Sequence, residues 1–196
     1  IGRRIMTSLL DKPSFLQRDL SPRDGNSHVT GPELQPLAFT SISKLLRDAA
    51  KRDGSREALS CPNNRLNYYD FDPTVDALAA GFLALGLDKG DRLGIWSPNR
   101  LEWVLTQFAT ARIGVLLVNI NPAYRLSELE YSLNTVGCKA IVLAQSLKSS
   151  NYLQMIRTLA PEIDTCRQGK LHSIKLPQLR HAASYKHLTL PTTPQL

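Results

Sequence analysis

The sequence contains few of the residues that build disulfide frameworks and zinc sites. Its 196 residues include only three cysteines. These cysteines, Cys61, Cys138 and Cys166, are odd in number and far apart, which fits neither a disulfide framework nor the paired spacing of zinc ligands. A reducing compartment, such as the cytosol or the mitochondrial matrix, is therefore the simpler expectation.

Several catalytic and binding motifs are absent as well. The strand-to-helix turns lack the glycines of a dinucleotide site, and neither a Walker glycine loop nor a Gly-x-Ser-x-Gly nucleophile elbow occurs. The longest nearly apolar stretch, residues 77–87, is shorter than the roughly 20 residues that a membrane-spanning helix requires, so no membrane span is expected. All histidines lie toward the ends of the chain, which leaves none for a catalytic triad or metal cluster in its middle. They are His28, His172, His181 and His187.

Positive charge exceeds negative charge, but the excess is not concentrated in one patterned region. Lysine and arginine number 24 against 17 acidic residues, a net charge of +7. The excess is +1 in residues 1–40, +3 in residues 41–160 and +3 in residues 161–196. A nucleic-acid-binding domain would gather its basic residues on one folded face, with aromatic side chains between them. We therefore expect no nucleic-acid partner.

Composition divides the chain into three regions. Residues 1–38 hold prolines and scattered charges without a hydrophobic period, which predicts a flexible lead-in. The arginines among serines in this region resemble the remnant of a mitochondrial transit peptide. Such peptides contain few acidic residues, however, and this region contains several aspartates. An ordinary N-terminal extension is the alternative. Residues 39–162 are strongly patterned and form the predicted domain. Residues 163–196 are predicted to be an irregular tail, disordered or an edge element, and the last twelve or so look like a spurious end.

The patterned region begins with a helix, a hairpin and a second helix. Asp72 can accept hydrogen bonds from the free amides of a first helical turn, and Pro73 at the next position needs no amide there. Apolar residues then recur at helical spacing as far as Gly86, where the second helix is predicted to end. The preceding elements are a helix over 42–51 behind the caps Thr40 and Ser41, and a hairpin of 57–61 with 65–69.

Further strands and helices alternate along the rest of the region. Consecutive aliphatic residues over 115–120 predict a parallel strand covered on both faces. Ser127 and Glu130 have the spacing of a capping box, which predicts where the next helix starts. The alternation implies right-handed crossovers and an α/β fold with a mainly parallel, doubly wound sheet. The other predicted elements are strands over 92–96 and 139–143 and helices over 101–113 and 152–159.

Several stretches, taken in order, resemble one enzyme superfamily. They are Leu-Asn-Tyr at 66–68, Ala-Ala-Gly-Phe-Leu-Ala-Leu-Gly-Leu at 79–87, Lys-Gly-Asp-Arg-Leu-Gly-Ile-Trp-Ser-Pro-Asn at 89–99 and Val-Asn-Ile-Asn-Pro-Ala-Tyr at 118–124. They are similar to the N-terminal part of the adenylate-forming superfamily of acyl-CoA synthetases, over about residues 39–162. Within this superfamily, these stretches most resemble the mitochondrial medium-chain fatty acid ligases. The resemblance implies the N-terminal subdomain of the adenylate-forming fold.

The resemblance also implies a reaction. A fatty acid carboxylate attacks the α-phosphate of ATP, and coenzyme A then displaces AMP from the acyl-adenylate. The implied cofactors are ATP, coenzyme A and Mg²⁺, the implied substrate is a medium-chain fatty acid, and the implied location is the mitochondrial matrix, otherwise the cytoplasm. The superfamily's phosphate loop, nucleotide contacts and catalytic lysine have no match in this sequence, so we assign no catalytic, cofactor-binding or metal residue. The chain alone is expected to be inactive and to bind none of these cofactors strongly.

Four residues are candidates for lining a ligand cleft: Asn119, Asn121, Tyr124 and Trp103. The first three surround the turn after the strand over 115–120, and ligands bind open α/β sheets beyond the carboxyl ends of their strands. Ordinary turn formation by Asn and Pro, and packing of the tryptophan, are the alternatives. Two other functions also stay open: a non-catalytic truncated isoform that acts as an interaction module, and a stand-alone nucleotide-binding module.

Overall fold

The computed structural model describes residues 39–62, 64–167 and 169–184. The chain divides into two compact units, Ile1–Phe39 and Thr40–Leu196, and the description below concerns the second unit by itself. The lead-in predicted for residues 1–38 and the spurious end predicted for the last twelve residues lie outside the described residues.

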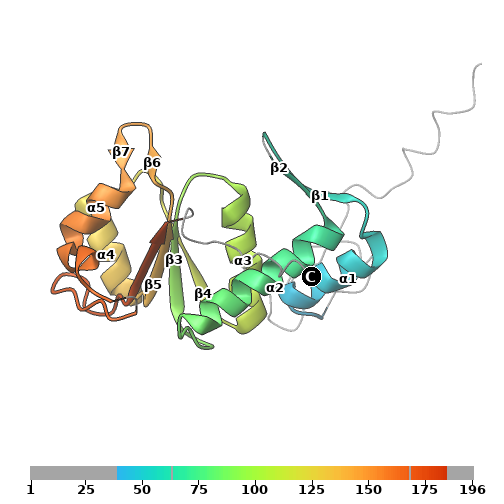
Figure 1. Cartoon of the computed structure of the whole chain (residues 1–196), viewed down its shortest axis with the longest axis horizontal. Coiled ribbons are helices and arrows are strands. Elements are labelled where there is room, and N and C mark those ends of the chain that lie inside the picture. The colour runs from blue at the N-terminus through green and yellow to red at the C-terminus, as the bar shows by residue number, and fades with distance from the viewer. Residues whose placement is uncertain (1–38, 63, 168, 185–196) are drawn as a thin grey trace, which may run out of the picture. The chain divides into compact units, whose positions relative to one another are not determined.

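Four parallel strands form the main sheet (Figure 1). In their order across the sheet they are β4 (Leu116–Ile120), β3 (Arg92–Trp96), β5 (Ala140–Leu143) and β8 (His181–Ser184). Every neighbouring pair is parallel, and the register places Trp96 opposite Ile120 on one side and Leu143 on the other. The carboxyl ends of β3, β4 and β5 therefore lie level at one edge of the sheet, which we call the carboxyl edge.

Helices cover both faces of this sheet, each over its own hydrophobic cluster (Figure 1). One face carries α4 (Leu126–Val136) and α5 (Tyr152–Leu159); the other carries α2 (Tyr68–Ala84) and α3 (Leu101–Ile113), with α1 (Ile42–Asp53) packed on α2. Adjacent residues of one strand, such as Ile141 and Val142, belong to different clusters, because side chains alternate between the faces of a strand. The predicted α/β, doubly wound architecture is confirmed.

Three smaller elements complete the unit. Two antiparallel hairpins are short and lie apart from the main sheet, and a 3-10 helix follows α5. These elements are β1 (Glu57–Cys61) with β2 (Asn64–Asn67), β6 (Ser146–Leu147) with β7 (Ser150–Asn151), and η2 (Pro161–Asp164).

Local sequence explains where several helices begin and end. The Ser41 hydroxyl accepts a hydrogen bond from the Lys44 amide at 3.1 Å, so the predicted cap of α1 is confirmed. Gly114 and Gly137 follow α3 and α4 with φ angles of 74° and 70°. This left-handed conformation favours glycine, which explains why both helices end where the sequence predicted.

α2 begins earlier than predicted. Asn67 Oδ1 accepts a hydrogen bond from the Asp70 amide at 2.8 Å, which makes Asn67 the N-cap. Tyr68 and Tyr69 therefore belong to the helix and not to the preceding strand, and the predicted start at Asp72 is wrong. Pro73 is accommodated in the second turn of the helix instead of the first.

The start of α4 and the exposure of β4 also differ from the prediction. Glu128 Oε2 accepts a hydrogen bond from the Arg125 amide at 3.1 Å, so the helix begins at Leu126 and the predicted Ser127 and Glu130 capping box is wrong. β4 is an edge strand among the described residues, and the side chain of Leu116 is 54% exposed. The prediction that both faces of this strand are covered is therefore wrong at its beginning.

The residues after α5 contribute to the core although they form little regular structure. Leu171, Leu176 and Leu179 are each 1% exposed and belong to the cluster beneath α4 and α5. β8 then pairs with β5 along its whole length. Of the two predicted alternatives, an edge element is what residues 181–184 form.

His181 in β8 makes stability depend on pH. Its Nδ1 atom is buried and has no hydrogen-bond partner among the described residues. Burial lowers the pKa of His181 below its usual value of 6.5, and the positive charges of Lys139 and Arg180 lower this pKa further. As the pH falls below about 6.5, the unfolded chain takes up a proton that the folded chain resists, so the free energy of unfolding should decrease. The decrease should level off below the lowered pKa of the folded state.

Urea unfolding at about pH 7.5 and about pH 5.5 measures this dependence. His181→Gln should lose less stability between the two conditions than the natural chain, whereas substitution of the exposed His172 by Gln should leave the loss unchanged. Equal losses for His181→Gln and the natural chain would contradict the assignment.

Candidate functional site

The carboxyl edge contains the point where the strand order reverses. From β3 the chain crosses to β4 on one side, and from β4 it returns to β5 on the opposite side of β3. In open α/β sheets, ligands bind beyond the carboxyl ends of the strands at such a reversal. The segments that meet there are residues 97–100 after β3 and residues 121–125 after β4, which we call the β4–α4 turn.

Two buried aromatic side chains hold the β4–α4 turn in place. Trp96 Nε1 donates a hydrogen bond to the Asn121 carbonyl oxygen at 3.1 Å, and the Tyr152 hydroxyl donates one to the Pro122 carbonyl oxygen at 2.5 Å. The rings of Trp96 and Tyr152 stack on each other at 3.8 Å and 16°, and both side chains are 0% exposed. Residues of β3 and α5 therefore fix the turn that follows β4, which suits a loop whose shape must be constant.

Hydrogen bonds within the turn complete its conformation. Asn121 Oδ1 accepts from the Ala123 amide at 2.9 Å, and the Asn121 carbonyl oxygen also accepts from the Tyr124 amide at 3.0 Å. This is the local side-chain-to-backbone pattern that makes Asn a frequent turn residue. The carbonyl oxygens of Asn121 and Pro122 are thus engaged by the protein itself, and Asn121 remains exposed at the start of the turn.

The four predicted cleft residues do not form one group. Asn121 and Tyr124 lie together in the β4–α4 turn, and Tyr124 packs against the cluster beneath α4 and α5. Asn119 is exposed and pairs in register with Ile95, one residue before the end of β4. Trp103 lies half-buried in the first turn of α3, and no hydrogen bond or ring contact joins it to the turn within the described residues.

Sequence analysis missed the roles of Trp96 and Tyr152. Trp96 is fully buried and packs in the core, and its indole N–H also orients the turn. Tyr152 was identified only as an apolar helix position. A polar aromatic side chain in a fully buried position is the signal that could have found both, since the N–H of tryptophan and the O–H of tyrosine need partners when buried.

The remaining titratable groups near the α4 and α5 cluster are poorly suited to acid–base or nucleophilic chemistry. Burial raises the pKa of the Cys138 thiol to about 11, which keeps it protonated and unreactive near neutral pH. Burial also raises the pKa of Tyr152, whose hydroxyl is already engaged with Pro122. Both groups therefore serve packing and positioning.

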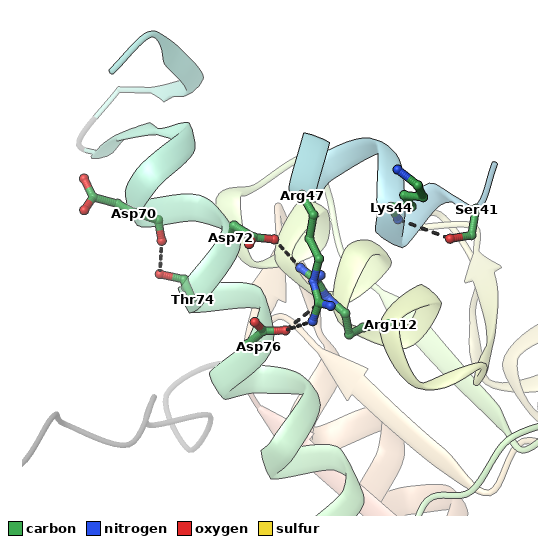
Figure 2. A network of polar contacts seen from close by, with 8 residues as sticks. All are labelled: Ser41, Lys44, Arg47, Asp70, Asp72, Thr74, Asp76 and Arg112. Atoms are coloured by element: carbon green, nitrogen blue, oxygen red, sulfur yellow. Dashed lines mark hydrogen bonds and ion pairs between the residues drawn. The ribbon is translucent and has the colours of Figure 1, made fainter. Parts of the chain in front are cut away.

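A second polar feature joins α1, α2 and α3 (Figure 2). Arg112 of α3 forms an ion pair with Asp72 of α2, and its Nε lies 3.1 Å from an oxygen of Asp76 one turn further along that helix. Arg47 of α1 reaches the same Asp76 oxygen at 3.4 Å. The side chains of Arg112 and Asp72 are 7% and 20% exposed, whereas Arg47 and Asp76 are about half-exposed, so a network with a buried centre ties three helices together.

Between α1 and α2 lies a cavity of about 420 Å³, which we call the α1–α2 cavity. Its walls are Arg47, Ala50 and Lys51 of α1 and Tyr69, Asp72 and Pro73 of α2. Sequence analysis gave no indication of this cavity, because its two walls come from separate helices whose relative position depends on tertiary packing.

Neither a metal cluster nor a membrane-spanning helix occurs in the part of the chain that the structure describes. Residues 39–62, 64–167 and 169–184 contain no group of three or more His, Cys, Asp or Glu side chains placed to hold a metal ion. Among the same residues, no helix has the length and apolar character needed to span a bilayer.

The fold is that of the N-terminal domains of adenylate-forming enzymes. The N-terminal domain of FACL13 from Mycobacterium tuberculosis superposes with a TM-score of 0.64 and 21% identity, over 76% of this chain and 34% of that one. The anthranilate CoA ligase AuaEII, solved with anthranoyl-AMP, superposes with a TM-score of 0.63 and 19% identity, over 78% and 26%. At these identities the likeness establishes the fold alone.

Sequence comparison gives the family. The model of the family described as AMP-binding enzyme matches residues 46–191, so this chain belongs to that family. Similar relatives include the mitochondrial medium-chain acyl-CoA ligase ACSF2 of Mus musculus, 43% identical over 160 residues, and that of Danio rerio, 42% identical over 155 residues. The matched regions cover 81% and 78% of this chain but only 26% of each relative, so the chain spans about a quarter of their length.

Proposed function

We propose that this chain is the N-terminal part of a medium-chain fatty acid–CoA ligase that acts in the mitochondrial matrix. In this proposal the full enzyme forms an acyl-adenylate from a medium-chain fatty acid and ATP, and then transfers the acyl group to coenzyme A. The observation that carries the proposal is the 43% identity, over most of this chain, to a relative named as a mitochondrial medium-chain acyl-CoA ligase.

The carboxyl edge gives this part of the enzyme a structural role. The β4–α4 turn lies where ligands bind open α/β sheets, and Trp96 and Tyr152 hold it rigidly. We propose that Asn121 and Tyr124 line the substrate cleft from this turn, with Asn119 and Trp103 at its border. A wall fixed in advance costs less entropy when substrate binds than a mobile loop does.

The turns at the carboxyl edge do not fit a triphosphate. Phosphate binding at such turns needs a row of free backbone amides, usually supplied by glycines. Here Pro98 and Pro122 have no amide hydrogen, and the Ala123 amide is bonded to Asn121. This supports placing the triphosphate contacts in segments that the longer relatives have and this sequence does not match.

The proposal predicts that the 196-residue chain alone has no ligase activity. With octanoate, ATP, coenzyme A and Mg²⁺, the folded chain should form no octanoyl-CoA above the level of a control without enzyme, because no phosphate-binding loop is present. Chromatographic detection of octanoyl-CoA checks this, with the mouse relative as the positive control. Formation of octanoyl-CoA by the chain would contradict the assignment.

A chimera tests the proposed function directly. The matching segment of the mouse ligase is replaced by the corresponding residues of this chain, and octanoyl-CoA formation is measured. Retained activity would support the proposal, whereas a folded chimera that binds ATP but forms neither acyl-adenylate nor octanoyl-CoA would contradict it.

A second candidate function rests on β4, the strand at one side of the main sheet among the described residues, and not on the carboxyl edge. The edge position of β4 and the exposure of Leu116 would suit an interaction module that pairs with another polypeptide. Size-exclusion chromatography tests this candidate together with the first, because both leave apolar surface uncovered in the isolated chain. A monomer at all concentrations would argue against both.

A further inference from the structure

The α1–α2 cavity lies between the last turns of α1 and the first turns of α2, and no residue of the carboxyl edge lines it. It is an open depression of the surface, with a volume of about 420 Å³, and not an enclosed cavity. Arg47, Ala50 and Lys51 follow the i, i+3, i+4 spacing of one helix face, and Tyr69, Asp72 and Pro73 do the same on α2. Two helix faces therefore oppose each other across the cavity.

The α1 wall is cationic. Lys51 forms no ion pair within the described residues and acts only at longer range on Asp48. Arg47 is half-exposed, and only its Nη2 atom is engaged, by Asp76 at 3.4 Å. Two cationic side chains one helical turn apart, both with unused donors, can hold one anionic group between them.

The acidic groups nearby do not cancel this charge. Asp72 in the opposite wall is paired with Arg112, and Asp76 is shared between Arg112 and Arg47. Among the lining residues, two cations, Arg47 and Lys51, face one carboxylate, Asp72, which is already paired with Arg112. Arg112 is more than nine-tenths buried, and its Nη1 atom has no hydrogen-bond partner among the described residues. An anion in the cavity would offset the surplus of positive charge that Arg47 and Lys51 give its lining.

The α2 wall presents a fixed aromatic ring. Tyr69 is 64% exposed, yet its amide donates to the Gly54 carbonyl oxygen at 3.0 Å and its ring lies directly against Gly54. A side-chain carbon at position 54 would occupy the space of that ring, so the glycine permits this placement. A large exposed aromatic ring held against the backbone, beside two cations, is suited to stacking on a planar ligand.

From these features we propose that the α1–α2 cavity binds a monophosphate attached to a planar ring. Its phosphate lies between Arg47 and Lys51, and its ring stacks on Tyr69. The site is independent of the ligase cleft proposed above, since the two share no residue. Loss of ligase activity in the chimera would therefore not bear on this site, and absence of binding here would not bear on the ligase.

Titration of the 196-residue chain with phenyl phosphate and with inorganic phosphate tests the proposal. Isothermal calorimetry should show saturable binding of phenyl phosphate, with a dissociation constant of about 1 mM or lower. Inorganic phosphate should bind more weakly, with a larger dissociation constant. Amide NMR shifts should be largest near Lys51 and Tyr69. No saturation, or shifts confined to other residues, would overturn the proposal.

Matched variants separate the two halves of the site. Lys51→Gln should weaken phenyl phosphate binding about fivefold or more, whereas Lys44→Gln, which removes the same charge from the same helix outside the cavity, should change it less than about twofold. Tyr69→Ala should reduce phenyl phosphate affinity to that of inorganic phosphate, and little unfolding is expected because Tyr69 is exposed. Equal losses in Lys51→Gln and Lys44→Gln would show non-specific charge attraction and overturn the site.

Discussion

Trp96→Ala is expected to lower the free energy of unfolding by about 4 kcal/mol, because truncation of a fully buried aromatic residue removes apolar contacts and leaves a cavity. The variant also loses the stacking contact with Tyr152 and the hydrogen bond to Asn121. Urea unfolding followed by circular dichroism measures the change.

Trp103→Ala is the matched control for this substitution. Trp103 is half-buried and lies outside both hydrophobic clusters, so its truncation should cost less than half as much. Hydrogen exchange gives a second readout, since the Ala123 and Tyr124 amides should exchange faster in Trp96→Ala and not in Trp103→Ala. If both variants lose the same stability with the same exchange, Trp96 has no special role in holding the β4–α4 turn.

The sequence predicted the bounds of β3 and β5 well, because buried parallel strands are short runs of aliphatic residues bounded by clear turn signals. β3 has the predicted bounds, and β5 differs by one residue. Helix ends marked by glycine were equally clear, as at Gly114 and Gly137. In these places local preference and tertiary structure agree, which is typical of a natural sequence.

Helix starts were less predictable because several residues can serve as the cap. Asn67 and Asp72 are both good N-cap residues, and Pro73 favoured the second of them. In the structure Asn67 caps the helix, and the Thr74 hydroxyl donates to the Asp70 carbonyl oxygen at 2.6 Å in the turn that contains Pro73. Which of two competing caps is used depends on where the chain enters the fold, and this cannot be read from local sequence.

The candidate site was predictable only in outline. A turn after a buried strand can be found from the pattern, and Asn121 and Tyr124 do lie together there. The role of Tyr152 in holding the turn could not be predicted, because it depends on how α5 packs and places the Tyr152 ring against that of Trp96. The α1–α2 cavity depends in the same way on how two helices pack, and its anchor is the network around Arg112.

Arg112→Ala is expected to lower the free energy of unfolding by about 3 kcal/mol. Removing the cation leaves the Asp72 carboxylate, which is 20% exposed, without its ion-pair partner, and an unpaired charge in a largely buried position is costly. Arg112→Lys should recover only part of the loss, since lysine keeps the charge but cannot bridge Asp72 and Asp76 with a planar fork of donors. Urea unfolding at low and high salt measures both variants.

Arg65→Ala provides the control, because Arg65 forms an ion pair with Glu57 at 2.6 Å in which both side chains are exposed. Such surface pairs contribute about 1 kcal/mol or less, so this variant should be nearly as stable as the natural chain. A double-mutant cycle of Arg112→Ala with Asp72→Asn then isolates the coupling between the two charges. If Arg112→Ala costs no more than Arg65→Ala, the network does not hold α1, α2 and α3 together. The α1–α2 cavity would then have to depend on apolar packing around Leu46 and Val75 instead.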